Sequence, residues 1–472
     1  MPCQWKKTVN PRKHFSDLEL TTLDAVFVSS QGNPNRAVVG SSAKALKLSE
    51  KQTAPSDQDI LTDEAESAVA HSNKENSKDE KPSIVTNPEE TPPLSGSQET
   101  EPPLSFNIQS ALEKEELVDH IRGAIYGNCI GDAIGLLTEF MSKSEAANIY
   151  ADHDQNKGLL GKLKDRLQSS SQRRASLEYD MKYADFHRCR WETGDWTDDS
   201  DQMILILLSL LDNKGKMVPK DFARKMKKWS REGFPELGDK GGMGIGRTTY
   251  GVLRHPDFQT DPHHAAEYVW EASGRFVAPN GGVMRTSILG VHDFGNIDTV
   301  IANTKAACKV THADPRCIAS CVAVTTAIAM MLQGKHFVKE SKSYDVKAVM
   351  KDAYEYARDI FETVEEEKEL EDHMFAKSLD DLQLDGEGKI GYTFKCLGAG
   401  FWSLRQDDFR ESLEAVTFEA GDADTNGAVA GALLGCKLGA SKLPESWLSG
   451  LKHKKWLDVH IDNFLALLGL KD

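Results

Sequence analysis

The chain has 472 residues, a formal net charge of −16 and eight cysteines. This negative charge argues against binding naked nucleic acid through a basic surface. The longest apolar run, Met203–Leu211, is too short to cross a membrane, and no apolar segment of a signal peptide follows the basic N-terminal residues. We therefore expect a cytoplasmic or nuclear monomer with reduced thiols and with neither membrane nor nucleic-acid partners.

Residues 1–111 differ in composition from the rest of the chain. Between Phe27 and Phe106 there is no Phe, Tyr or Trp, and Ser, Glu, Lys, Thr, Asn and Pro are abundant. Such a segment buries too little apolar surface to offset the loss of chain entropy on folding. The sequence therefore predicts a disordered, low-complexity tail over 1–111 and one large folded domain over 112–472.

The predicted domain is all-α, because apolar residues recur at helical spacing and alternating strand patterns are nearly absent. The segments predicted to be helical are 114–140, 202–212, 219–229, 263–272, 298–312, 314–333, 345–368, 409–418 and 426–439. Two further segments, 154–190 and 377–389, are predicted to be loops or insertions.

Glycines recur at every fourth residue in two of these segments. The two series are Gly123, Gly127, Gly131 and Gly135, and Gly427, Gly431 and Gly435. Each series leaves one helix face without side chains, at a cost of roughly 1 kcal/mol per glycine relative to alanine. Close helix–helix packing explains most of these glycines, and it predicts that the two helices lie at the centre of the domain and carry a site at their ends.

Acidic residues are concentrated at two predicted helix starts. Thr197-Asp198-Asp199-Ser200-Asp201 precedes one apolar helix, and Gly421-Asp422-Ala423-Asp424-Thr425-Asn426 precedes another. One or two acids would serve as a helix cap and complement the helix dipole. Three acids in one motif exceed that need and repel one another unless a cation is present. Hard oxygen ligands of this kind suit Mg²⁺ or Mn²⁺, and two such motifs suit a two-metal site.

Two more acidic residues lie in the segment predicted to be helical over 114–140. Asp132 is surrounded by apolar residues, and we interpret it as a buried cap or hydrogen-bond anchor. Glu139 lies near the C-terminal end, where the helix dipole disfavours a carboxylate. Its position there suggests a base or a group that orients water.

Three loops complete the candidate site. The loop Gly238–Thr248 is rich in glycine, which would let backbone N–H groups approach a diphosphate, although a flexible turn is the simpler interpretation. A dinucleotide-binding loop is excluded because no apolar strand precedes it. The other two loops are Pro279–Arg285 and Thr311–Pro315, and the single histidine of the latter suits a structural hydrogen bond as well as a ligand contact.

Taken in order, these motifs resemble the ADP-ribosylglycohydrolase family over about Leu117–Trp447. The motifs are GDAIGLLTEF, TDDSDQ, GGMGIGRTT, NGGVMR, THADP and GDADTNGAVAGALLG. The resemblance implies an orthogonal all-α domain with a binuclear Mg²⁺ or Mn²⁺ centre. It also implies cleavage of the glycosidic bond between ADP-ribose and a modified protein side chain, arginine or serine.

The resemblance also assigns roles to residues of this chain. The implied metal ligands are Thr197, Asp198, Asp199, Asp422, Asp424 and Thr425. The implied catalytic residues are Glu139, Asp199 and Asp424. The loop implied to wrap the diphosphate and the distal ribose comprises Gly242, Met243, Gly244, Ile245 and Gly246. The remaining residues implied to line the ADP-ribose cleft are Asn280, Gly281, Gly282 and His312.

Some positions depart from the family pattern. Ala423 stands where Thr or Pro is common, Ser200 replaces a frequent Thr, and the insertion near 169–176 is not a family feature. All six implied ligands are present, which favours an enzyme. The alternatives are a catalytically silent ADP-ribose binder, a structural protein like the lens members of the family, or a hydrolase of another ADP-ribosyl compound.

Overall fold

The computed structural model describes residues 110–151 and 176–471. Helices dominate these two ranges, as expected for an all-α domain, and β1 (Phe337–Val338) pairs with β2 (Ser343–Tyr344) in a short antiparallel hairpin. The predicted tail over 1–109 and most of the predicted loop 154–190 lie outside the described residues. Ser110 and Ala111, which the sequence assigned to the tail, belong to the domain, because they hydrogen-bond the carbonyls that end α10.

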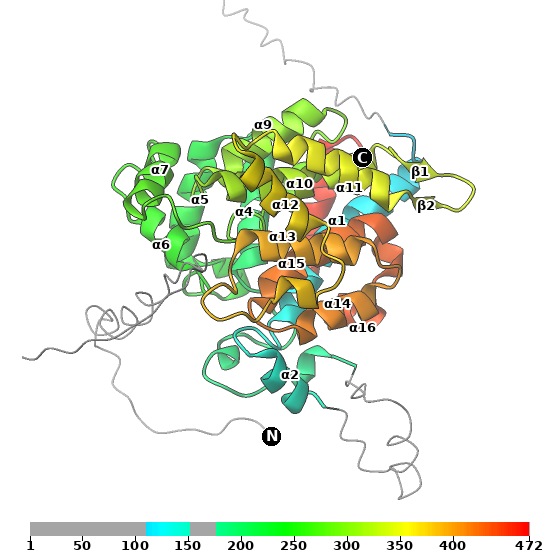
Figure 1. The fold of residues 1–472 in the computed structure, drawn as a ribbon, viewed down its shortest axis with the longest axis horizontal. Helices are drawn as coiled ribbons and strands as arrows, with labels where there is room; N and C mark the ends of the chain where they lie inside the picture. The colour runs from blue at the N-terminus through cyan, green and yellow to red at the C-terminus, as the bar shows by residue number, and fades with distance from the viewer. Residues whose placement is uncertain (1–109, 152–175, 472) are drawn as a thin grey trace, which may run out of the picture. The chain divides into compact units, whose positions relative to one another are not determined.

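Figure 1 shows the helices of the described part packed around α1, α10, α13 and α15. The α-helices are α1 (Lys114–Gly135), α2 (Lys143–Ile149), α4 (Asp198–Asp212), α5 (Pro219–Glu232), α6 (Arg247–Leu253), α7 (Pro262–Ala272), α8 (Ser287–Val291), α9 (Ile297–Cys308), α10 (Pro315–Leu332), α11 (Val346–Arg358), α12 (Val364–Met374), α13 (Thr393–Leu404), α14 (Phe409–Phe418), α15 (Ala423–Leu438), α16 (Glu445–Gly450) and α17 (Lys454–Leu467).

The two glycine series meet face to face, as the sequence predicted. A Cβ added at Gly127 of α1 would lie 2.1 Å from the carbonyl oxygen of Gly431 of α15. The same contact recurs along the seam, at Gly123 with Gly435 and at Gly131 with Gly427. The helices run antiparallel, so the end of α1 lies beside the start of α15. This arrangement brings the segment that carries Glu139 to the second acidic motif.

The central helix α10 is apolar along its whole length. Among the described residues, it is the helix with the length and composition to cross a membrane, but 89% of that window is buried inside the domain. This is the pattern of a core helix in a globular protein. Six of the cysteines in the described residues are buried free thiols and Cys189 is an exposed one, as expected for reduced thiols.

Several predicted boundaries were wrong. The segment 345–368 is two helices, α11 and α12, because Thr363 accepts a hydrogen bond from the Glu366 N–H and starts a new helix. The predicted helices 202–212 and 426–439 begin earlier, at Asp198 and Ala423. Thr197 and Asp422 are therefore the N-cap residues of α4 and α15, and the residues that follow them in each motif form the first turn of the helix.

Helices α2, α6, α8, α13, α16 and α17 were not predicted. Four of them have seven residues or fewer and α13 contains two glycines, so neither length nor propensity singled these out, whereas α17 is 14 residues long and was simply overlooked.

Candidate active site

The start of α4 is fixed by Asp132 of α1. Its carboxylate accepts hydrogen bonds from the Thr197 N–H (2.9 Å), the Ser200 N–H (3.0 Å) and the Ser200 hydroxyl (2.6 Å). These bonds satisfy amides that an α-helix leaves unpaired at its start. The prediction of a buried cap at Asp132 is confirmed, with the difference that it caps a different helix from its own.

Glu139 is held in place by a turn that follows α1. The Phe140 N–H donates to the Gly421 carbonyl (2.6 Å), and the Gly421 N–H donates to the Met141 carbonyl (3.0 Å). Phe140 and Ala420 both have a left-handed backbone, with φ of 61° and 60°. Such strain in residues other than glycine is typical of functional sites. The paired turns place Glu139 directly beside the start of α15.

Five acidic side chains converge here, and we call them the carboxylate cluster: Glu139, Asp198, Asp199, Asp422 and Asp424. One carboxylate oxygen from each of Glu139, Asp422 and Asp424 lies within 4.8 Å of the others. The Thr197 hydroxyl joins the two helix starts, 3.2 Å from Asp199 Oδ2 and 3.3 Å from Asp424 Oδ2. The structure thus brings both predicted ligand motifs and Glu139 into one cluster.

Burial and mutual repulsion dominate the electrostatics of the cluster. Desolvation, followed by the charges of neighbouring acids, raises the pKa of Asp198, Asp199 and Asp424 well above the usual range. Desolvation also raises the pKa of Glu139, against the lowering effect of His187. Crowding several buried acids is unfavourable on its own, so the arrangement costs stability that helix capping does not explain.

The glycine loop predicted to contact the diphosphate lies against this cluster. A Cβ added at Gly244 would lie 2.2 Å from Asp198 Oδ1, and φ is +91° at this residue, so glycine is required on both counts. Gly242 is packed against the Trp229 indole, and a Cβ added at this glycine would lie 2.9 Å from the ring. Gly244 and Gly246 are exposed, and Met243 and Ile245 are half-buried.

The Asn280–Gly282 segment contacts the cluster from another side. The Asn280 amide donates to Asp422 Oδ2 (2.8 Å), and the Asn280 N–H donates to the Gly391 carbonyl (3.0 Å). His312 is buried beneath this segment, and a Cβ at Gly281 would lie 2.9 Å from its ring. Burial and the charge of Arg285 lower the pKa of His312 well below its usual range. His312 is therefore a neutral ring that supports the loop.

The residues 113–471 match the profile of the family described as ADP-ribosylglycohydrolase. This match covers most of the chain. The chain belongs to the ADP-ribosylglycohydrolase family. The resemblance of the motifs is thereby confirmed, and so is the expectation of a hydrolase.

Relatives of this glycohydrolase occur in bacteria and archaea. An uncharacterized protein of Archaeoglobus fulgidus is 26% identical over 72% of this chain and 94% of its own length. The ADP-ribosyl-dinitrogen reductase glycohydrolase of Rhodospirillum rubrum is 25% identical, over 75% of this chain and 97% of its own. The ADP-ribosylarginine hydrolase Tri1 of Serratia proteamaculans is 24% identical, over 76% and 82%.

A solved structure described as an ADP-ribosylglycohydrolase-related protein complex shares the fold. It aligns with a TM-score of 0.51 and 24% identity, over 76% of this chain and all of its own. The helical class expected from the sequence is thus also that of a solved member of the glycohydrolase family.

The side chains present in this glycohydrolase fit a divalent cation. Asp199 Oδ1 is buried and has no hydrogen-bond partner among the described residues. Asp422 is the N-cap residue of α15 but makes no capping hydrogen bond with its side chain, so its carboxylate, which accepts one hydrogen bond from Asn280, is not used to cap the helix. Buried acceptors of this kind are normally satisfied, and oxygen atoms from carboxylates and a threonine hydroxyl form the donor set that Mg²⁺ and Mn²⁺ prefer.

Thr425, the remaining predicted ligand, lies in the first turn of α15, and its N–H donates to Asp424 Oδ1 (2.8 Å). Its side chain also lowers the pKa of Asp199 through a hydrogen bond. Thr425 therefore touches both acidic motifs.

The sequence missed His187 and Arg188, because they lie within the segment 154–190 that was interpreted as a loop or insertion. His187 Nε2 lies 2.6 Å from Glu139 Oε2. Arg188 is buried and donates to the carbonyls of Leu137 (2.8 Å) and Glu139. Together they orient the side chain and the backbone of Glu139. Their sequence, with His and two Arg near Trp191, has no spacing that would have identified them.

Arg285 stands at the end of one sequence motif, but it organises the site from within the core. It is fully buried, and its guanidinium donates to Gln202 (2.8 Å) and to Thr311 (2.7 Å). Gln202 in turn donates to Asp198 Oδ2 (2.6 Å). Burial lowers the pKa of Arg285 to about 10, so it stays charged and links the His312 loop to the carboxylate cluster.

Proposed function

We propose that this glycohydrolase cleaves the bond between ADP-ribose and a modified protein side chain in a metal-dependent reaction. The observation that carries the proposal is the convergence of Glu139, Asp422 and Asp424 within 4.8 Å, next to a glycine loop that contacts Asp198. Relatives named as ADP-ribosylarginine hydrolases favour arginine as the first linkage to test. Serine is the second.

The proposed ligands are Thr197, Asp198, Asp199, Asp422, Asp424 and Thr425, and the proposed cofactor is two Mg²⁺ or Mn²⁺ ions. Bound there, such cations supply positive charge that orients hydroxyl groups of the distal ribose and lowers the pKa of bound water. The buried acids of this chain support the proposal, because a cation would remove the repulsion that raises their pKa values.

Glu139 is the proposed base. Its carboxylate is held by His187 and its backbone by Arg188, so it points in a fixed direction at the edge of the cluster. Desolvation raises its pKa, which makes it a better proton acceptor from an attacking water. The negative charges of Asp199 and Asp424 would stabilise the positive charge that develops on the ribose in an oxocarbenium-like transition state.

The two loops would hold the rest of the substrate. Gly242, Gly244 and Gly246 present backbone without side chains where the diphosphate would approach, and the intervening Met243 and Ile245 supply apolar contacts. Asn280, Gly281 and Gly282 would line the cleft on the other side, supported from below by His312. Asn280 also fixes Asp422.

The experiment measures ADP-ribose release from arginine-linked, serine-linked and free-metabolite substrates, with Mg²⁺ and with a chelator. Release from a protein side chain that requires Mg²⁺ supports the proposal. Release only from a free ADP-ribosyl compound would reassign the substrate. Tight ADP-ribose binding without release of any linkage would contradict the proposal and establish a silent binder.

A further inference from the structure

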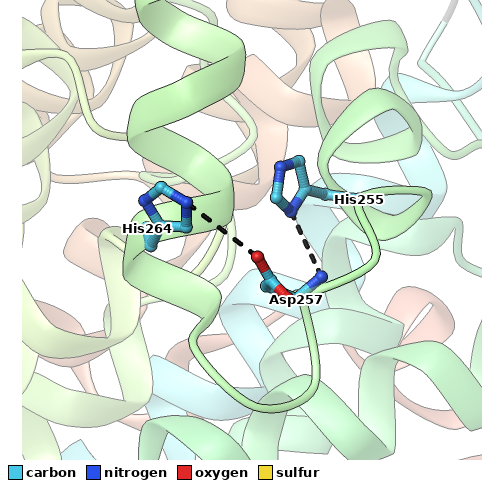
Figure 2. Close-up of side chains that lie close together, drawn as sticks. All are labelled: His255, Asp257 and His264. Atoms are coloured by element: carbon cyan, nitrogen blue, oxygen red, sulfur yellow. Dashed lines mark hydrogen bonds and ion pairs between the residues drawn. The ribbon is translucent and has the colours of Figure 1, made fainter.

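A second group of metal-ligating side chains lies at the turn between α6 and α7. His255 follows the end of α6, Asp257 lies in the turn, and His264 is in the first turn of α7. Figure 2 shows the three side chains around one point, with both rings directed toward the Asp257 residue. One ligand atom from each of the three lies within 4.8 Å of the others. We call these residues the α6–α7 triad.

The backbone of the triad is fixed by a series of tight turns. The Phe258 N–H donates to the His255 carbonyl (3.1 Å), and the Thr260 and Asp261 N–H groups both donate to the Asp257 carbonyl (2.9 and 2.7 Å). The Phe258 side chain is buried and anchors the turn in the core. The three side chains thus extend from a rigid backbone, although their tips are partly exposed.

The ring positions are also restrained. The His255 ring packs against the Tyr268 ring at 4.9 Å and meets the His264 ring edge-on at 5.6 Å. The Asp261 carboxylate caps α7 through the His264 N–H (3.2 Å), which fixes the residue from which that ring extends. The nearby cation Arg254 is engaged with Tyr250, whose hydroxyl it contacts at 3.3 Å.

The contacts within the triad are too long for strong bonds between its members. His264 Nε2 and Asp257 Oδ2 are 3.9 Å apart, and the Asp257 N–H donates to His255 Nδ1 at 3.2 Å. Around a tetrahedral ion with bonds of about 2.0–2.1 Å, ligand atoms are separated by roughly 3.3 Å. Small rotations of the exposed Asp257 and His264 side chains and of the half-buried His255 ring reach that separation, and an ion at His255 Nδ1 would replace only the weak amide contact.

The donor set differs in kind from that of the carboxylate cluster. Two imidazoles and one carboxylate suit Zn²⁺ and similar transition-metal ions, whereas the all-oxygen cluster suits Mg²⁺ or Mn²⁺. Three protein ligands leave one position of a tetrahedral ion open to water.

We propose that His255, Asp257 and His264 bind one divalent transition-metal ion of the Zn²⁺ class. Such an ion would join the end of α6 to the start of α7. Since α6 begins directly after the Gly242–Gly246 loop, the ion would stabilise the helix pair on which that loop is mounted. This site is separate from the proposed hydrolytic site and does not depend on the proposed function.

The test is a calorimetric titration of the full chain with ZnCl₂ in the presence of saturating Mg²⁺. The zinc that stays bound after dialysis is measured in a second experiment. His264→Ala and Asp257→Asn each remove one ligand, and Asp257→Asn keeps the backbone bonds of the turn. We expect each to weaken the Zn²⁺ affinity by about tenfold or more, since even outer contacts of a metal site are worth about 10- to 100-fold.

His336→Ala is the matched control. His336 also lies beside a carboxylate, with its Nε2 2.9 Å from Asp352 Oδ2. Among the described residues, however, this pair has no third ligand residue close enough to complete a metal site. This variant should bind Zn²⁺ like the wild type. Unchanged Zn²⁺ affinity in both His264→Ala and Asp257→Asn would overturn the proposal, and so would the absence of zinc binding by the wild-type chain.

Discussion

The carboxylate cluster and the α6–α7 triad both gather potential metal ligands, but in opposite environments. Asp199 and Asp424 are buried at the ends of closely packed helices, whereas Asp257 and His264 are exposed at a turn. Burial makes the repulsion within the cluster expensive, because water no longer screens it. The triad contains only one acid beside its two histidine rings, so the arrangement costs little folding free energy. Substitutions should therefore have large effects in the first region and small ones in the second.

The largest expected effect is on catalysis at Glu139. Glu139→Gln keeps the size of the side chain but removes the proposed base, and we expect turnover to fall by about 10²–10⁴-fold. ADP-ribose affinity should change little, because the proposed diphosphate and adenosine contacts lie in other loops. The measurement is kcat and the dissociation constant of ADP-ribose for both proteins.

Glu365→Gln, on the exposed face of α12, is the control and should match the wild type. Full activity in Glu139→Gln would contradict the assignment and transfer the role of orienting water to an acid of the two helix starts.

The next effect concerns metal-dependent stability. A cation that binds only the folded state stabilises it by about 2.7 kcal/mol at a hundredfold excess over the dissociation constant. We expect Mg²⁺ to raise the Tm of the wild type and of Asp257→Asn, but not that of Asp424→Ala. Asp424→Ala should also stabilise the metal-free protein, because it removes a buried acid whose charged form is disfavoured by desolvation and by its acidic neighbours. Calorimetry measures the Tm of each protein with and without Mg²⁺. If Mg²⁺ raises the Tm of Asp424→Ala as much as that of the wild type, the cluster is only a charged helix start.

Packing gives a third contrast between the regions. Gly127→Ala should lower the free energy of unfolding by about 1–3 kcal/mol, because the new Cβ would overlap the Gly431 carbonyl. Gly251→Ala in α6 meets only the Val269 side chain at 3.8 Å. That substitution should stabilise the protein by about 0.5–1 kcal/mol through helix propensity. Urea denaturation measures both, and equal effects would contradict the difference in packing.

The smallest effect is the pH dependence of the metal-free protein. Burial raises the pKa of Asp132 to about 7, so the folded state holds a proton that the unfolded state, with a pKa near 4, has lost. Stability is therefore fully present below pH 4 and is lost as the pH rises through 7. Between pH 8 and 6 we expect Asp132 to raise the free energy of unfolding in a chelator by about 1.4 kcal/mol in total.

The pKa values of Asp198, Asp199 and Asp424 are also raised, so these residues contribute to the pH dependence of stability in the same direction. Saturating Mg²⁺ should remove the part of this slope that comes from these three proposed ligands, because the cation competes with protons for their oxygens. Urea denaturation at three pH values measures the slope, and a metal-free protein that gains stability toward pH 8 would contradict the assignment of buried, protonated acids.

Much of this could be predicted from local patterns in the sequence. The facing glycines required a close helix pair, and the excess of acids at the starts of α4 and α15 indicated a site at its end. Asp132 was identified as an anchor because a lone acid among apolar residues needs a partner.

The rest depends on contacts between distant segments. His187 reaches Glu139 across 48 positions, and Asn280 reaches Asp422 across 142; neither pair has a spacing that a sequence reveals. The break between α11 and α12 was missed because the sequence there contains strong helix formers on both sides of Thr363. The α6–α7 triad escaped notice for a similar reason, since His255 lies in the turn after α6, which was not predicted, and His264 lies in α7.

The indole N–H groups of Trp196 and Trp229 both donate to Asp201, at 2.8 and 2.9 Å. Asp201 is two residues from Asp199, and the Trp229 ring packs against Gly242 of the Gly242–Gly246 loop. Two fluorophores therefore share one carboxylate between the proposed metal ligands and the proposed substrate loop. The intrinsic emission of the unlabelled protein should thus report occupancy of the site, and Trp229→Phe, which keeps the ring against Gly242 but removes the indole N–H, should remove much of that signal.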